Sequence, residues 1–352
     1  MNEPSDTKAA IARPLRELGF IVVSIVVGLL LAFALLRQVF IPTVGFPGDL
    51  ERLVLLDKRV RQAPDGARRI AIVSNSVGVE GVEGSTVGSM MDDGFVVENQ
   101  AANGLDLLSA RIYIGHLLGS QPDTVVWILR PELMGQLKEL NPEVASAMRL
   151  AGFAESADWI NATPPPPGLD EEMIARLKAG DLSNTISLRT LPLRHLNQIV
   201  RTRARKGILA ARPMNIDAPY QIDTQLEGEK LARHISDVTE SYHQRTADNN
   251  RDGLAFIEQT VGQIRAASVR AVLVIAPTHP DATDFVDADA AFAEALREIS
   301  QRSGAPLINL SGLLAADEFA DAIHPNRVGS ARFSAGLGNA LAPILNPPGE
   351  GG

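Results

Sequence analysis

The chain has 352 residues, a formal net charge of −9 and no cysteine. The acidic balance argues against a nucleic-acid-binding protein, because phosphate contacts require clustered Lys and Arg side chains. Without cysteine, the protein forms no disulfide, zinc–thiolate site or iron–sulfur cluster, and it has no cysteine nucleophile.

The N-terminal part contains one long apolar run, LGFIVVSIVVGLLLAFALL at 18–36. At about 1.5 Å per residue, this run matches the ~30 Å hydrocarbon core of a bilayer and predicts one transmembrane helix. Three basic residues precede it, so the positive-inside rule leaves the tail 1–17 in the cytoplasm and the rest of the chain in the periplasm. A signal peptide cleaved after Ala32-Phe33-Ala34 and a buried helix of a soluble core are the alternatives.

After a juxtamembrane linker with one short helix at 37–67, the folded domain is expected from 68 to 346. Apolar, β-branched runs predict strands at 70–73, 94–97, 124–129, 271–275 and 306–310. Helical patterns lie at 105–118, 227–249, 253–267, 288–302 and from 327 onward. This alternation predicts an α/β fold, a flavodoxin-like three-layer sandwich with a parallel sheet, preceded by the one N-terminal transmembrane helix.

Three segments do not fit the alternation. The region 131–220 contains the proline-rich stretch 163–168, which excludes a helix there, and it is interpreted as an insertion over the carboxyl edge of the sheet. The glycine-rich stretch 78–84 lacks the Gly-Lys-Ser/Thr of a nucleotide loop and is expected to be a mobile loop. The tail 347–352 is expected to be disordered.

Two polar motifs at opposite ends of the chain suggest chemistry. Asp321 precedes His324 by three residues, and a Pro follows, so the carboxylate can bind one imidazole nitrogen and leave the other free as a general base. Ser76 follows the strand predicted at 70–73, where open α/β sheets place their active sites. Ser76, His324 and Asp321 therefore predict a catalytic triad, with His279 after a later strand as a candidate substrate contact.

These motifs resemble those of the SGNH (GDSL-like) hydrolases. Ser76, in Ser74-Asn75-Ser76, takes the place of the nucleophile, and Asp321-x-x-His324 matches the last block of the family. The block Asn99-Gln100-Ala101-Ala102-Asn103-Gly104 resembles Asn-x-Gly-x-x-Gly with Ala in place of the first Gly. The resemblance implies an oxyanion hole made by the backbone N–H groups of Ser76 and Gly104, with Asn75 and Asn99 as further candidates for substrate contact.

One block departs from the family pattern. The third strand of the family ends in Gly-x-Asn-Asp, whose Asn donates to the oxyanion, whereas 124–129 runs into Arg130-Pro131-Glu132 here. Arg130 is therefore a candidate replacement donor and a candidate substrate contact. Loss of one oxyanion donor costs about 3 kcal/mol of transition-state stabilisation.

Membrane-anchored proteins similar to this family act in alginate acetylation and in teichoic acid D-alanylation. The resemblance implies a serine esterase or O-acyltransferase that acts on acyl esters of a cell-envelope polysaccharide, with a membrane acyltransferase as a partner and with no cofactor or metal. The alternative is a catalytically inactive subunit with the same fold that binds or assembles the envelope machinery. A soluble nucleotide-binding protein is disfavoured because no phosphate loop is present.

Overall fold

The computed structural model describes residues 5–35, 49–61, 66–91, 94–136 and 225–346, together with Ile216 and Pro219. Most of the insertion predicted at 131–220 and all of the tail 347–352 lie outside the described residues.

The fold is built on a five-stranded parallel sheet with the strand order β2-β1-β3-β4-β5. The strands are β1 (Arg68–Val73), β2 (Phe95–Asn99), β3 (Thr124–Leu129), β4 (Arg270–Ile275) and β5 (Leu307–Asn309). All five predicted strands are confirmed: 124–129 has the predicted ends, and the ends of the other four differ by at most two residues. The order reverses direction beside β1, and in open α/β sheets ligands bind at the carboxyl ends of the strands at such a point.

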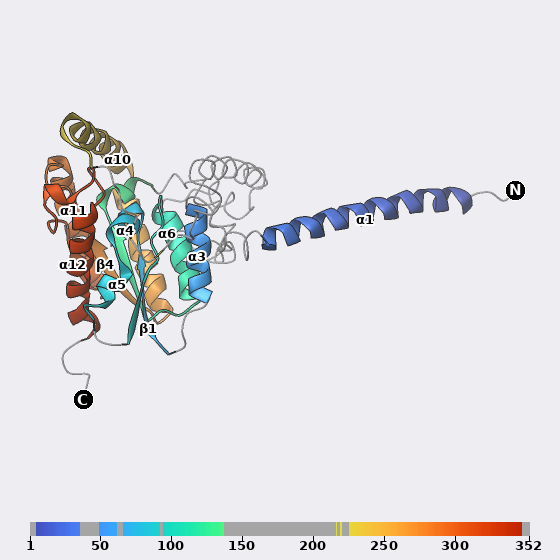
Figure 1. Ribbon diagram of the computed structural model, residues 1–352, viewed down its shortest axis with the longest axis horizontal. Helices are drawn as coiled ribbons and strands as arrows, with labels where there is room; N and C mark the ends of the chain where they lie inside the picture. Colours follow the sequence, from blue (N-terminus) through green and yellow to red (C-terminus); the bar gives the residue numbers. More distant parts are fainter. Residues whose placement is uncertain are drawn as a thin grey trace, which may run out of the picture.

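Helices cover both faces of this sheet (Figure 1). On one side lie α3 (Asp49–Arg61), α6 (Leu107–Leu118), α10 (Gly228–Ala266) and α11 (Thr283–Ser303). On the other side lie α4 (Ser76–Gly81), α5 (Gly84–Gly88) and α12 (Arg327–Leu345). Two short 3-10 helices, η2 (Pro131–Gln136) and η4 (Ala316–Glu318), follow β3 and β5. The two helices predicted at 227–249 and 253–267 are one continuous helix, α10.

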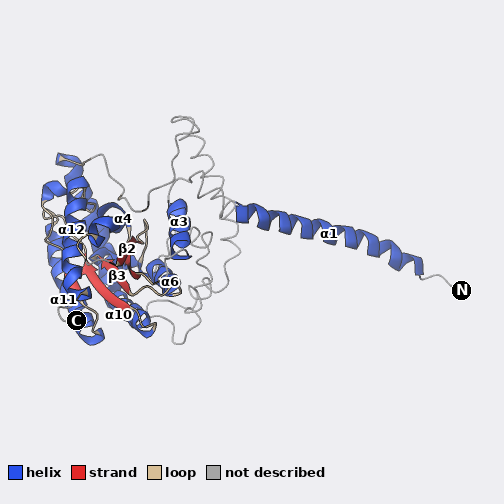
Figure 2. Cartoon of the chain, turned by 60° about the horizontal axis from the view of Figure 1, so that its bottom comes forward, coloured by secondary structure: helices blue, strands red, loops and turns tan. Residues whose placement is uncertain are grey.

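The alternation of side chains along β1 produces the two cores. Ala71 and Val73 pack with the apolar side chains of α3, α6, α10 and α11, whereas Ile70 and Ile72 pack with those of α4, α5 and α12. All four side chains are buried. Complete burial of an Ile or Val side chain contributes about 1.5–3 kcal/mol, so the sheet is stabilised from both sides. The predicted three-layer α/β arrangement is confirmed (Figure 2).

The folded unit includes part of the segment predicted as a linker. Leu53 and Leu56 of α3 are fully buried in the core that α6 and α10 share. Arg52, also buried, donates a hydrogen bond to the carbonyl oxygen of Ala101. The domain therefore begins before residue 68, because the apolar face of α3 is part of its core.

The glycine-rich stretch 78–84 forms the end of α4 and the start of α5, not the loop that the sequence predicts. Gly78 lies so close to β1 that an added Cβ would be 2.4 Å from the Cβ of Ser74. Gly84 approaches β2, where an added Cβ would be 2.8 Å from the carbonyl oxygen of Val97. These glycines permit close packing of helix on strand; they do not provide a flexible loop.

The N-terminal helix α1 (Ser5–Leu35) extends away from the sheet domain in both views (Figures 1 and 2). No helix in the described ranges combines the length and the apolarity that crossing a bilayer requires. The transmembrane segment predicted at 18–36 is therefore not confirmed.

Candidate active site

Ser76 lies at the first position of α4, directly after β1. Asn75 caps this helix: its side-chain oxygen accepts a hydrogen bond from the N–H of Val77 at 3.1 Å. Capping by Asn is favourable because the first N–H groups of a helix have no partner within it. Asn75 is thus used for local structure, and it fixes the turn that presents the Ser76 hydroxyl at the carboxyl end of the sheet.

His324 reaches the same place from the C-terminal part of the chain. The loop between η4 and α12 closes on itself: the Ala320 N–H donates to the His324 carbonyl oxygen at 2.8 Å, and the Asn326 N–H donates to that of Glu318 at 2.9 Å. Asn326 then caps α12 by accepting from two backbone N–H groups. The loop is therefore held at both ends, which fixes the position of the His324 ring.

The side chains of the predicted triad lie within hydrogen-bond distance of one another. The Oγ of Ser76 lies 2.9 Å from Nε2 of His324, and Nδ1 of His324 lies 2.9 Å from Oδ2 of Asp321. The other oxygen of Asp321 accepts the backbone N–H groups of Ile323 at 2.7 Å and His324 at 2.8 Å. The carboxylate thus holds the imidazole by Nδ1–H and leaves Nε2 free to accept the serine proton.

The carboxyl group of Asp321 is kept ionised by its partners. Burial by itself raises the pKa of Asp321, but the hydrogen bonds and charge of His324 and the two backbone N–H groups outweigh burial. The pKa of Asp321 therefore falls from 3.8 to about 2. An ionised carboxylate at neutral pH can stabilise the imidazolium that forms during proton transfer.

A second carboxyl group, which the sequence analysis missed, lies at the same imidazole. Oε2 of Glu80 is 3.8 Å from Nδ1 of His324, and this oxygen is buried without a hydrogen-bond partner among the described residues. Burial raises the pKa of Glu80 to about 7; the charge of His324 lowers it and that of Asp321 raises it. Its position four residues after Ser76 could have revealed it, had 76–81 been recognised as helical.

The two backbone groups of the predicted oxyanion hole remain available. Within the described residues, neither the Ser76 N–H nor the Gly104 N–H has a backbone acceptor. Gly104 has a φ of 65°, the left-handed region that glycine adopts without strain. Glycine in this conformation often occurs where the backbone approaches a ligand closely.

Both polar side-chain atoms of Asn99 are hydrogen-bonded within the protein. Its amide nitrogen donates to the carbonyl oxygens of Gly78 at 2.9 Å and Val82 at 2.7 Å, and its oxygen accepts the Ala101 N–H at 3.0 Å. With 1% exposure and every polar atom bonded, Asn99 has no group left for a substrate. It joins the nucleophile helix to the loop that ends at Gly104, so its role is structural.

Arg130 has a similar supporting role. The guanidinium is buried, donates to the carbonyl oxygen of Ile323 at 3.1 Å and pairs with Glu132 at 2.6 Å. Ile323 directly precedes His324, so Arg130 holds the loop of the general base from the end of β3. The third strand therefore ends in a side chain that supports the loop of His324.

His279 lies at the carboxyl end of β4 and is completely buried. Its Nδ1 accepts the Asp281 N–H at 3.1 Å, and its ring packs against Phe319 with 5.0 Å between ring centroids. Burial lowers the pKa of His279, although the charges of Asp281 and Asp321 oppose this. Its Nε2 is buried without a hydrogen-bond partner among the described residues, so its role as a substrate contact stays a prediction.

Two other histidines have partners that the sequence did not indicate. Nε2 of His116 on α6 lies 2.9 Å from Oδ1 of Asp57 on α3, and His234 on α10 accepts the Ala322 N–H at 3.3 Å. Both contacts join elements distant in sequence and have a structural explanation. In the part of the chain that the structure describes, no three His, Asp or Glu side chains are grouped as metal ligands.

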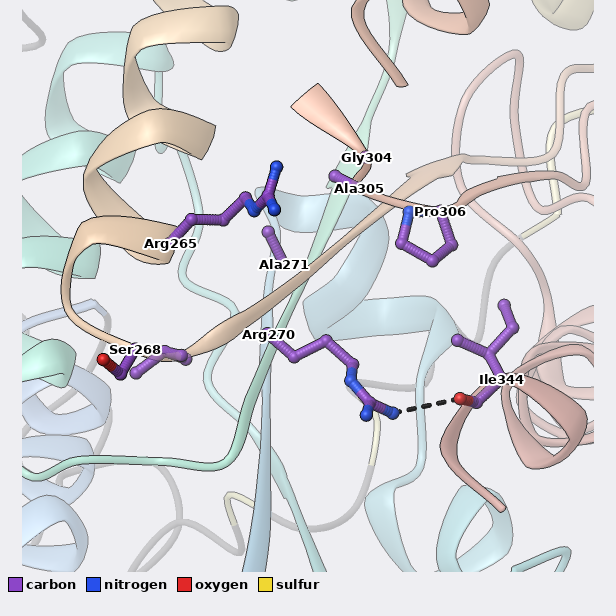
Figure 3. A pocket seen from close by; sticks show the side chains of 9 residues that line it. Arg265, Ser268, Arg270, Ala271, Gly304, Ala305, Pro306 and Ile344 are labelled. Carbon is purple, nitrogen blue, oxygen red and sulfur yellow. Dashed lines mark hydrogen bonds between the residues drawn. The ribbon is translucent and has the colours of Figure 1, made fainter. Parts of the chain in front are cut away.

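A cavity at the opposite end of the sheet is separate from the triad (Figure 3). It lies where β4 begins, and its lining includes Arg265, Arg270, Gly304 and Ile344. Arg270 donates a hydrogen bond to the carbonyl oxygen of Ile344 at 3.0 Å. Because the triad lies at the carboxyl ends of the strands, this cavity does not contribute to it.

Among known proteins, no family model matches the chain, and no curated protein matches it either.

Proposed function

We propose that the protein is a serine-dependent acyl-transfer enzyme, an esterase or an O-acyltransferase. The observation that supports this is the hydrogen-bonded series Ser76–His324–Asp321, with 2.9 Å at each of its two side-chain contacts. These distances lie within the range at which a general base can take the proton of a nucleophile.

The chemistry follows from this arrangement. The Ser76 Oγ attacks the carbonyl carbon of an ester while its proton moves to Nε2 of His324. The negative charge that develops on the carbonyl oxygen is stabilised by the N–H groups of Ser76 and Gly104. Collapse breaks the ester bond, and the leaving alkoxide takes the proton from His324. Water or a sugar hydroxyl then gives its proton to His324 and attacks the acyl-serine. The bond between the acyl carbon and Oγ breaks, His324 returns the proton to the Ser76 Oγ, and an acid or a new ester is released.

A serine-reactive fluorophosphonate tests the nucleophile. We expect the wild-type protein to be labelled, the Ser76→Ala protein to remain unlabelled and His324→Gln to react much more slowly. Ser74→Ala is the matched control, because the Ser74 hydroxyl is buried two residues away and should not react. Undiminished labelling of the Ser76→Ala protein would refute the assignment.

We further propose that the acyl group belongs to a cell-envelope polysaccharide, as the resemblance of the motifs implies. Incubation with an acetyl donor and an envelope oligosaccharide should give either an acetylated sugar or free acetate, depending on whether transfer or hydrolysis dominates. Mass spectrometry of the sugar together with an assay for acetate separates the two outcomes. If neither product forms with any acetylated or free envelope polysaccharide, this substrate class is wrong.

Attachment to a membrane is proposed on a separate observation. The apolar side chains of α1 from Leu18 to Leu31 are exposed, Phe20 by 74%. A contiguous exposed apolar surface marks contact with a membrane or a partner. We propose that this segment holds the α/β domain at the extracytoplasmic side of the inner membrane, with a membrane acyltransferase as the source of acyl groups. Recovery in the soluble fraction before any salt or carbonate wash would refute the attachment, and resistance to protease in spheroplasts would refute the orientation.

The second candidate is a catalytically inactive binding or assembly subunit. It is favoured by Arg130, which occupies the position of the third oxyanion donor and is bonded to Ile323 and Glu132. If this candidate holds, Ser76→Ala and His324→Ala retain cellular function, and changes within 131–220 abolish it.

A further inference from the structure

The feature that the proposed mechanism does not use is the carboxyl group of Glu80. Ser76 and Glu80 are four residues apart on α4, so their side chains lie on the same face of the helix. On this face the Ser76 hydroxyl contacts one nitrogen of the His324 ring at 2.9 Å, while Glu80 lies 3.8 Å from the other nitrogen. One short helix thus provides a group to each side of the general base.

The environment of Glu80 is unusual for a carboxyl group. Its side chain is 15% exposed, and Oε2 has no hydrogen-bond donor among the described residues. A buried polar atom without a partner costs stability. Such a cost at the centre of a site is typical of a group retained for function and not for stability.

The charged groups near Glu80 lie on the loop before α12 and on α12 itself. His324 and Asp321 act on it from the loop before α12. On α4 itself Glu80 is the only titratable side chain, and α12, which packs against α4, has Arg327 and Arg332. Arg332 is bonded to Glu318. The electrostatic partner of Glu80 is therefore the His324 imidazole.

We propose that Glu80 is a second carboxyl partner of His324, a positioning residue that stabilises the imidazolium formed when Ser76 loses its proton. The proposal rests on the proposed acyl-transfer function. During the reaction the serine proton moves to Nε2, Nδ1–H stays bonded to Asp321, and no proton passes to Glu80. Ionised Glu80 adds a second negative charge beside the imidazolium, whereas protonated Glu80 adds none.

The ionisation of Glu80 makes this contribution dependent on pH. Because burial raises the pKa of Glu80 to about 7, the group changes from neutral to charged across the neutral range. The ratio of wild-type to Glu80→Gln kcat/KM should therefore rise with pH, from about 1 at pH 5.5 to about 10 at pH 8.5. The change should be in kcat with little change in KM, since Glu80 acts through His324. Glu258→Gln, which removes a carboxylate bonded to Arg302, is the matched control and should leave the ratio at 1.

A measurement that needs no catalysis tests the pair directly. In protein labelled with carboxyl-¹³C glutamate, the Glu80 resonance is identified by its loss in Glu80→Gln, and its titration is followed by NMR. We expect a midpoint near the pKa of about 7, which rises in His324→Gln and falls in Asp321→Asn. A midpoint near the ordinary 4.5, or one that His324→Gln leaves unchanged, would overturn the proposal.

The two proposals fail in different ways. If the fluorophosphonate does not label Ser76 but the Glu80 midpoint responds to His324→Gln, the acyl-transfer function is wrong and the carboxyl–imidazole pair stands. If labelling depends on Ser76 and the pH-dependent ratio is absent, the role of Glu80 is wrong and the function stands.

Discussion

Replacement of Glu80 by Gln should stabilise the protein at alkaline pH and have little effect at acid pH. Burial favours the protonated form of Glu80 in the native state and raises its pKa from 4.5 to about 7. Below pH 4.5 the carboxyl group is protonated in both the folded and the unfolded state. Between pH 4.5 and about 7 the unfolded chain is ionised while folded Glu80 keeps its proton, so stability is lost over this window, and the loss is complete once the folded protein also ionises above pH 7.

The magnitude follows from the pKa. A rise from 4.5 to about 7, at ~1.36 kcal/mol per pH unit, corresponds to about 3 kcal/mol of destabilisation once Glu80 is ionised. Screening by solvent at this partly exposed site reduces the expected value to about 2 kcal/mol. For a domain of this size, with an unfolding entropy of about 0.6 kcal/mol/K, that energy corresponds to a Tm higher by about 3 °C in Glu80→Gln at pH 8.5.

Urea denaturation followed by circular dichroism at pH 4.5, 6, 7 and 8.5 measures the difference between Glu80→Gln and wild type. The comparison cancels the titration of groups that do not interact with Glu80. Glu258→Gln is again the control, and because its ion pair with Arg302 is exposed, its effect should stay within about 0.5 kcal/mol at every pH. A stability difference for Glu80→Gln that is constant across the range, or that is negative at pH 8.5, would refute the reasoning.

Two further variants test the loop that holds the general base. Asp321→Asn should lower kcat by up to about 10⁴-fold, because the amide stabilises the wrong tautomer of His324. It should also remove stability that the wild type keeps above pH 3.8 and loses as the pH falls towards the pKa of about 2, so identical acid unfolding curves would contradict this. Gly329→Ala would place a Cβ 2.0 Å from the carbonyl oxygen of Glu318 and should destabilise by about 1–3 kcal/mol in thermal unfolding. Gly262→Ala, in open space on α10, should stabilise by about 0.5–1 kcal/mol, and equal effects of the two alanines would exclude the steric argument.

The residue types within short segments of the chain were enough to predict most of the sheet and the three residues of the triad. The strands at 70–73 and 124–129 are mostly apolar and rich in β-branched residues, which is typical of strands that are buried on both faces. The Asp321–His324 contact is also local, because a three-residue spacing before a proline is enough to bring carboxylate and imidazole together. Ser76 was predicted as a site residue because it comes after the first strand, and parallel strands bring their carboxyl ends to one edge of the sheet.

Other features have no local signature. The sequence predicts a loop at 78–84 because glycine usually marks flexibility, but these glycines are needed where helices approach the sheet. Residues four apart share a face only in a helix. Because a loop was predicted here, the sequence did not indicate that Glu80 and Ser76 lie on the same side. Arg130 and Asn99 were candidates for substrate contact because polar residues at strand ends often bind ligands, and only the positions of Ile323 and Gly78 reveal their supporting roles.

The sequence by itself determined the alternation of strands and helices, the serine after the first strand and the acid–histidine pair, because each depends on residues close together in the chain. The tertiary structure decided that α3 belongs to the core, that a second carboxyl group faces the general base and that His279 and Arg130 support the triad loop. Those contacts join segments far apart in sequence, and their partners are selected by packing, which no local pattern encodes.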